Sequence, residues 1–210
     1  MYFSTLTVLR VALLASLTLS LAGCDMLGFR DWSWRQKLTV TVETPTGVKT
    51  GSAVTAARME DPPKWWGAGD AAGAMNDSLR GEAVVVDLGP AAPGPRYLFA
   101  LLKGYSVWTA YAAFFPDMAG KPMPEDARHA LYDQLESLRA TEDLPRELYP
   151  LLITFADIND PASVSRVDPD DLAAHFGPGY ALSSITLAIT DETVTKGRVE
   201  AVLGWWCDYR

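Results

Sequence analysis

The sequence predicts an α+β fold, a mostly antiparallel sheet built from hairpins with three to four helices packed on it. Three observations support this prediction. Residues 32–43 alternate between apolar and polar side chains, with the period of two that is typical of a half-buried strand. Two short apolar runs, residues 82–88 and 96–103, flank a turn rich in Pro and Gly. Residues 124–140 place apolar side chains at three- and four-residue spacing, as an amphipathic helix does.

The first predicted hairpin covers residues 32–59. The turn from Thr44 to Gly51 contains one Pro and two Gly, and residues 52–59 return as the partner strand. Trp32 and Trp34 could instead sit at a membrane interface, but their continuity with the apolar face favours the core. The residues expected on that face are Trp32, Trp34, Gln36, Leu38, Val40 and Val42.

A long connection follows at residues 60–81, where no periodic pattern is sustained. Connections of this length in a compact domain tend to be functional or disordered. Trp65 and Trp66 lie in it side by side. Two exposed indoles could stack on a sugar, a peptide or a lipid, and the alternative is that they fold back as a lid on the core. We therefore treat Trp65 and Trp66 as candidate binding residues.

The second hairpin, residues 82–88 with 96–103, is nearly continuous in apolar side chains, which predicts central strands covered on both faces. Residues 106–115 are apolar all round a helix, with Ser106 as a cap and Pro116 as a stop, so this helix is expected to be buried against the sheet. The helix over residues 124–140 should pack through Ala127, Leu131, Leu135 and Leu138.

The second half of the chain predicts strands over residues 149–155 and 181–190, and a helical tail with Val199, Val202, Leu203 and Trp206 on one face. The acid-rich residues between Asp157 and Asp171 do not fit an EF-hand loop, because Ala162 stands where the loop needs Gly. Asp168 is instead expected to cap a helix that has Pro169 in its first turn and ends at Gly177.

Charge excludes one class of partner. The chain has 26 acidic and 18 basic residues, and Arg10 is the only charged residue before Cys24. A chain that starts at Cys24 therefore carries 17 bases against 26 acids, a formal charge of −9. Nucleic-acid phosphates repel such a protein unless it has a local basic patch, and the sequence shows no long basic run. No nucleic-acid partner is expected.

The first residues of the chain suggest where in the cell the protein is located. Residues 11–22 form an uncharged apolar run, and Leu21, Ala22, Gly23 and Cys24 follow the pattern of a lipobox. This segment resembles that of bacterial lipoproteins. The resemblance implies a signal peptide at residues 1–23, a lipidated anchor and short tether at residues 24–31, and a single globular domain at residues 32–210. It also implies a cell-envelope protein tethered to a membrane through lipid on Cys24, with its domain in the periplasm, and Asp25 slightly favours the inner membrane.

One alternative for the leader stays open. The residues before Arg10 are apolar, so the first 22 residues could span a membrane, although an arginine inside such a span is costly. If Cys24 carries lipid, Cys207 is the only other cysteine and no internal disulfide forms. Cys207 has no nearby His or basic cluster in sequence, and we interpret it as a partly buried structural residue.

Catalytic motifs are scarce. The chain has no Gly-x-Ser-x-Gly elbow, no Ser-x-x-Lys and no phosphate-binding glycine loop, and its two histidines are far apart. The weak catalytic candidates are His175 and Asp171, four residues apart on one predicted helix, and carboxylate pairs that meet only in the fold stay possible. We predict no cofactor and no metal.

These observations favour a non-catalytic binding or scaffolding module of the envelope, whose partner is an envelope protein or a glycan. One alternative is a hydrolase that acts on cell-wall or glycan polymers. Another is a carrier that holds a small ligand or a lipid in a pocket between sheet and helices.

Overall fold

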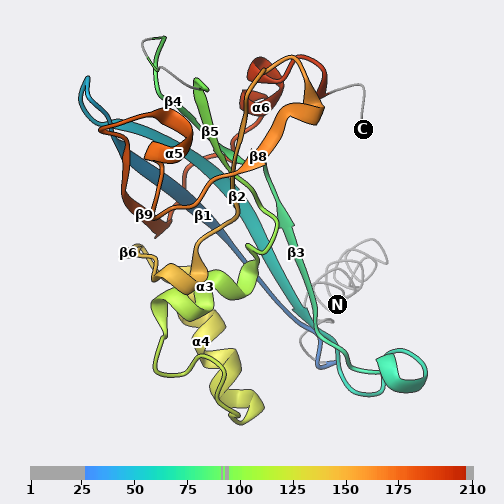
Figure 1. Ribbon diagram of the computed structural model, residues 1–210. Helices are drawn as coiled ribbons and strands as arrows, with labels where there is room; N and C mark the ends of the chain where they lie inside the picture. Colours follow the sequence, from blue (N-terminus) through green and yellow to red (C-terminus); the bar gives the residue numbers. More distant parts are fainter. Residues whose placement is uncertain (1–26, 91, 93–94, 207–210) are drawn as a thin grey trace, which may run out of the picture. The chain divides into compact units, whose positions relative to one another are not determined.

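Two antiparallel sheets and several short helices make up the chain, which confirms the predicted α+β class (Figure 1). The computed structural model describes residues 27–90, 92 and 95–206. The five-stranded sheet runs in the order β3 (Asn76–Arg80), β2 (Lys49–Asp61), β1 (Arg30–Glu43), β9 (Ala181–Ile189) and β6 (Thr141–Asp143). The four-stranded sheet runs in the order β4 (Val84–Asp87), β5 (Tyr97–Ala100), β7 (Leu152–Phe155) and β8 (Val164–Arg166).

The helices of the described residues are short. They are the α-helices α3 (Val107–Phe114), α4 (Glu125–Ser137), α5 (Ala173–Phe176) and α6 (Arg198–Val202), with 3₁₀ turns η1 (Gly69–Ala71), η2 (Arg146–Leu148) and η3 (Pro161–Ser163). Helix α3 contacts α4 and β6, whereas α6 contacts β4. None of these helices is long and apolar enough to cross a membrane.

The contacts divide the chain into two compact units. The first unit holds the residues up to Trp32 together with Met59–Asp77. The second unit holds Ser33–Arg58 together with the chain from Ser78 onward. Both sheets have most of their strands in the second unit.

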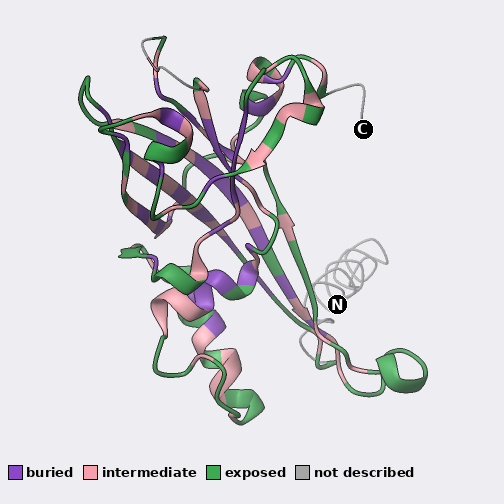
Figure 2. Ribbon diagram, in the orientation of Figure 1, coloured by how far each residue is buried: buried purple, intermediate pink, exposed green. Residues whose placement is uncertain are grey.

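The alternating pattern of β1 is confirmed. All six predicted core residues of this strand, from Trp32 to Val42, are buried, while the residues between them are partly or fully exposed (Figure 2). Strand β9 pairs with β1 so that Leu187 lies opposite Leu38 and Ile185 lies opposite Val40. Since paired residues point to the same face of a sheet, the buried faces of the two strands form one continuous surface.

Gly51 lets the two sheets approach each other. This residue of β2 is buried, and a Cβ atom built on it would collide with the backbone carbonyl of Val85 in β4. Only glycine lacks that atom, so a larger residue would force the backbones apart. The second hairpin therefore lies directly against the first.

Ser106 caps α3, as predicted. Its side chain accepts a hydrogen bond from the Trp108 amide at 3.2 Å, and its own amide donates to the Thr109 hydroxyl, which forms a capping box. The helix is only partly covered, however, because Trp108 is exposed and the last turn is half-buried. It packs on α4 through Tyr111 and Tyr132 rather than lying wholly within the core.

Three other predictions need correction. Residues 60–81 contain strand β3, a short polar strand that no periodic pattern marked. Strand β4 lies at the edge of the four-stranded sheet with Asp87 exposed, and the described strands of that sheet with neighbours on both sides are β5 and β7. Asp168 does not cap a helix, because α5 begins five residues later at Ala173, although it ends at Gly177 as predicted.

Candidate functional site

An apolar pocket lies between the four-stranded sheet and α6, and its volume is about 420 Å³. Its walls come from four segments that are distant in sequence, at residues 81–83, 99–103, 153–155 and 199–206. Phe99, Ile153, Phe155, Val199 and Leu203 form a buried cluster beneath it. The Phe99 and Phe155 rings meet edge to face at 5.5 Å, which fixes their positions in the wall.

Three charged residues, Glu82, Lys103 and Glu200, are among those that line this apolar pocket. Both carboxylate oxygens of Glu82 accept a hydrogen bond from the Arg198 amide, at 3.0 and 3.1 Å, and one also accepts from the Val199 amide at 3.3 Å. This charge therefore stabilises the first turn of α6. Glu200 also lines the pocket and has an interaction partner of its own. Lys103 is the lining cation, and within the described residues its ammonium group has no ion pair.

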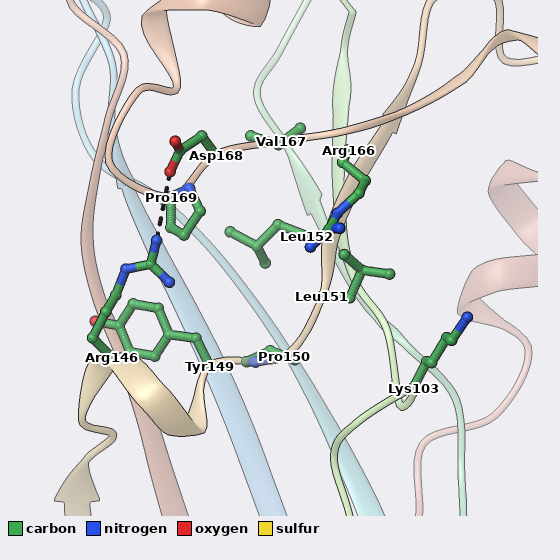
Figure 3. Close-up of a pocket in the computed structure, with 10 residues that line it drawn as sticks. All are labelled: Lys103, Arg146, Tyr149, Pro150, Leu151, Leu152, Arg166, Val167, Asp168 and Pro169. Carbon is green, nitrogen blue, oxygen red and sulfur yellow. Dashed lines mark hydrogen bonds and ion pairs between the residues drawn. The ribbon is translucent and has the colours of Figure 1, made fainter.

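A second pocket of about 590 Å³ adjoins Lys103 and is polar (Figure 3). Arg146 donates to Asp170 at 2.9 Å and to Asp168 at 3.5 Å, and its guanidinium lies 5.4 Å from the centre of the Tyr149 ring. The hydrogen bond from Arg146 lowers the pKa of Asp170 below its ordinary value. Asp168 and Asp170 thus hold Arg146 in place, which explains the acids that sequence spacing assigned to a helix cap.

Figure 3 also shows how the cations of this polar pocket are directed. The Arg166 guanidinium points toward Leu152, across the pocket from Arg146, and the Lys103 ammonium points away from Arg146. Lys103 lines the apolar pocket as well. Lys103 is therefore shared by the apolar pocket and the polar pocket.

A third pocket, of about 310 Å³, lies over β1, β2 and the end of α4. Three of its charged residues have partners, because Arg139 forms an ion pair with Asp191 at 2.6 Å and Glu136 accepts from the Ser33 amide at 2.9 Å. The rest of the lining is mixed and consists of Trp34, Arg35, Ala56, Ala57 and Thr190.

In the first unit, the predicted binding residues Trp65 and Trp66 are exposed, at 60% and 55%. Phe29 packs edge to face on both, with ring centres 5.7 Å from Trp65 and 5.1 Å from Trp66, and the two indoles lie 6.0 Å apart. We call Phe29, Trp65 and Trp66 the aromatic cluster. The indoles pack on each other and on Phe29, and more than half of each stays open to solvent.

His175 and Asp171 lie on or next to α5, away from the three pockets. Asp171 accepts a hydrogen bond from the Ala174 amide at 3.1 Å, and the backbone amide of His175 donates to the Leu172 carbonyl. Neither residue lines any of the three pockets described above. Their geometry is that of a helix end. Cys24 and Cys207 lie outside the described residues.

No protein-family model, no curated protein and no solved structure matches this chain. A function for this chain must therefore be inferred from its own structure. Sequence reasoning missed Lys103 and the pocket around it, because no local motif marks a lysine in the turn after a strand. The one signal was the near-continuous apolar run of residues 96–103, which ends at this lysine.

Proposed function

We propose that this protein is a lipid-anchored binding protein of the bacterial cell envelope, and that it holds an amphiphile with an apolar body and an acidic group. The observation that carries the proposal is the apolar pocket with Lys103 in its lining. The apolar body would occupy the space between β5, β7 and α6. The acidic group would lie at Lys103, which lines both the apolar pocket and the polar pocket.

The size and lining of the pocket support a small ligand. Ligand pockets commonly measure a few hundred cubic ångströms, with mainly apolar walls and a few polar groups that orient the ligand. This pocket has such walls, and Lys103 supplies the polar group. An ammonium beside an apolar cavity attracts an anionic head group while the cavity takes up the apolar part.

The same arrangement favours binding over hydrolysis. A hydrolase needs an acid–base pair at the place where its substrate lies. The candidates His175 and Asp171 do not line the apolar pocket, and Asp171 accepts from the Ala174 amide instead. The charged residues that line this pocket are Glu82, which caps α6, Glu200, which has a partner of its own, and Lys103. The alternative of a protein or glycan partner would use an exposed surface rather than this cavity.

The lipid anchor rests on the lipobox-like residues that end in Cys24. The intact mass of the N-terminal peptide, isolated from membranes of the native host, tests it. We expect an acylated peptide that begins at Cys24. A peptide that begins at Met1 would instead indicate an uncleaved anchor and would overturn this part of the proposal.

Two fluorescent probes test the pocket. Anilinonaphthalene sulfonate is anionic and phenylnaphthylamine is neutral, and both become bright in apolar sites. We expect both to bind the protein saturably. Lys103→Met should weaken the binding of the anionic probe by about tenfold, because a charge-assisted contact contributes roughly 1.5 kcal/mol or more. The affinity for the neutral probe should stay nearly unchanged.

Two further variants complete the experiment. Ala83→Trp places a large side chain at a half-buried position of the pocket wall and should weaken both probes. Lys121→Met removes an exposed lysine that lines none of the three pockets and should change neither affinity. Equal loss of both probes in Lys103→Met would contradict the role of the lysine charge, and no effect of Ala83→Trp would show that the pocket is not the binding site.

A further inference from the structure

We infer that the aromatic cluster of Phe29, Trp65 and Trp66 inserts into the membrane–water interface beside the lipid anchor, so that the bilayer itself is its binding partner. This inference rests on the lipid anchor of the proposed function. It assigns a second contact with the same membrane, made by side chains rather than by the lipid on Cys24.

Chain length places the cluster close to the anchor. Phe29 follows Cys24 by five residues, and a fully extended chain of that length spans no more than about 18 Å. The hydrocarbon core of one leaflet is about 15 Å thick, with the head groups outside it. Acyl chains buried from Cys24 therefore keep Phe29, and the indoles packed on it, within reach of the interface.

Backbone hydrogen bonds hold the loop that carries the two exposed indoles of the aromatic cluster. The Trp66 amide donates to the Pro63 carbonyl at 2.8 Å, and the Gly73 amide donates to the Trp66 carbonyl at 2.9 Å, which closes residues 63–73 into a loop. Gly73 has a φ of +67°, and a Cβ there would lie 2.7 Å from Cα of Lys64. The closed loop restricts the backbone beside both indoles, and their contacts with Phe29 and with each other restrict the rings, so less conformational freedom is lost when they bind.

The chemistry of the cluster suits an interface better than an anionic surface. Tryptophan concentrates where apolar chains meet water, because its ring is apolar and its N–H donates to polar groups. Leu27, 56% exposed, adds an aliphatic side chain to the same short segment. The described residues of this unit carry only Arg30 and Lys64 as bases, against five acids: Asp31, Glu60, Asp61, Asp70 and Asp77. The contact should therefore depend on apolar burial and respond little to salt.

The experiment uses the acylated chain in phosphatidylcholine vesicles that contain lipids brominated near the head of the acyl chain. Bromine quenches only tryptophans that lie in the membrane. We expect quenching in the wild type, and loss of most of it in the double variant Trp65→Ala with Trp66→Ala. Trp108→Ala removes an exposed indole of the second unit and should leave the quenching nearly unchanged.

A second arm separates the cluster from the anchor. The mature chain with Cys24→Ala should still bind these vesicles weakly, and the double tryptophan variant should lower that affinity by about tenfold or more, with little effect of added salt. Equal quenching in wild type and double variant would overturn the inference. So would aqueous iodide reaching both indoles on vesicles, which would leave a protein or a glycan as the partner. A missing acyl group on Cys24 would overturn only the anchor, because the unacylated arm does not depend on it.

Discussion

The indole Nε1 of Trp34 donates a hydrogen bond of 2.9 Å to Oε1 of Gln36, and both side chains are buried in β1. The two residues are neighbours on one face of the strand, two positions apart. Within the described residues, the amide Nε2 of Gln36 has no hydrogen-bond partner. The indole N–H of Trp34 and the side-chain oxygen of Gln36 are therefore paired. The amide N–H₂ of Gln36 lowers the stability of the fold, since a buried donor without a partner keeps its desolvation penalty.

A double-mutant cycle on this pair should show strong coupling. Trp34→Phe leaves Gln36 without its donor, and Gln36→Leu leaves the indole N–H without its acceptor, so we expect each to destabilise the fold by roughly 1–3 kcal/mol. The double variant should cost less than the sum, because no buried polar group is then left unpaired. Urea unfolding measures all four proteins. Additive effects would contradict the pairing.

Tyr105 should make the protein sensitive to alkali. Its side chain is buried, its hydroxyl has no hydrogen-bond partner among the described residues, and burial raises its pKa well above the ordinary 10.0. As pH rises above about 10, the unfolded state loses this proton while the folded state keeps it. The free energy of unfolding should then fall by up to about 1.4 kcal/mol for each pH unit.

Tyr105→Phe tests this directly. Near neutral pH the variant should be as stable as the wild type or slightly more stable, because the removed hydroxyl has no hydrogen-bond partner in the part of the chain that the structure describes. Above about pH 10 its stability should fall less steeply with pH than that of the wild type. Unfolding by urea at several pH values gives both slopes, and identical slopes would show that the phenol is not held neutral by the fold.

Glu82 should contribute to stability through α6. Its carboxylate accepts from the first two amides of that helix, so Glu82→Ala leaves two donors without this acceptor and should destabilise the protein by about 1 kcal/mol. Glu82→Gln retains an oxygen acceptor and should cost less. Urea unfolding measures both, and faster hydrogen exchange at the Val199 amide should accompany the loss. An alanine variant as stable as the glutamine variant would argue against the cap.

Gly73 should be intolerant of a side chain. Gly73→Ala adds both the strain of a positive φ, roughly 1 kcal/mol, and a collision with the backbone at Lys64. The expected result is a loosened loop, seen as faster proteolysis between residues 63 and 73. Gly120→Ala is the matched control, since Gly120 has a φ of +70° and no atom near its absent Cβ. If the two variants were cleaved at the same rate, the close approach of Gly73 to the Lys64 backbone would have no effect on the loop.

Local sequence patterns predicted those strands and helices whose structure depends mainly on neighbouring residues. The alternation of residues 32–43 predicted β1 and its buried face, and Ser106 predicted the start of α3, because each depends on side chains close in sequence. The same reasoning failed at Asp168. A cap on α5 was plausible locally, but Arg146, more than twenty residues earlier, binds Asp168 and Asp170 instead. The polar strand β3 likewise depends on its partner β2 rather than on its own pattern.

Composition and short-range spacing can be read from the chain alone, and they were enough to predict the fold class, the acidic charge and the lipobox-like start. Which side chains come together in a site depends on contacts between distant residues. Phe29 meets Trp65 and Trp66 across more than thirty residues, and Lys103 reaches a pocket whose walls come from four distant segments. The physical reason is that burial and pairing depend on which strands become neighbours, and no local spacing specifies that choice.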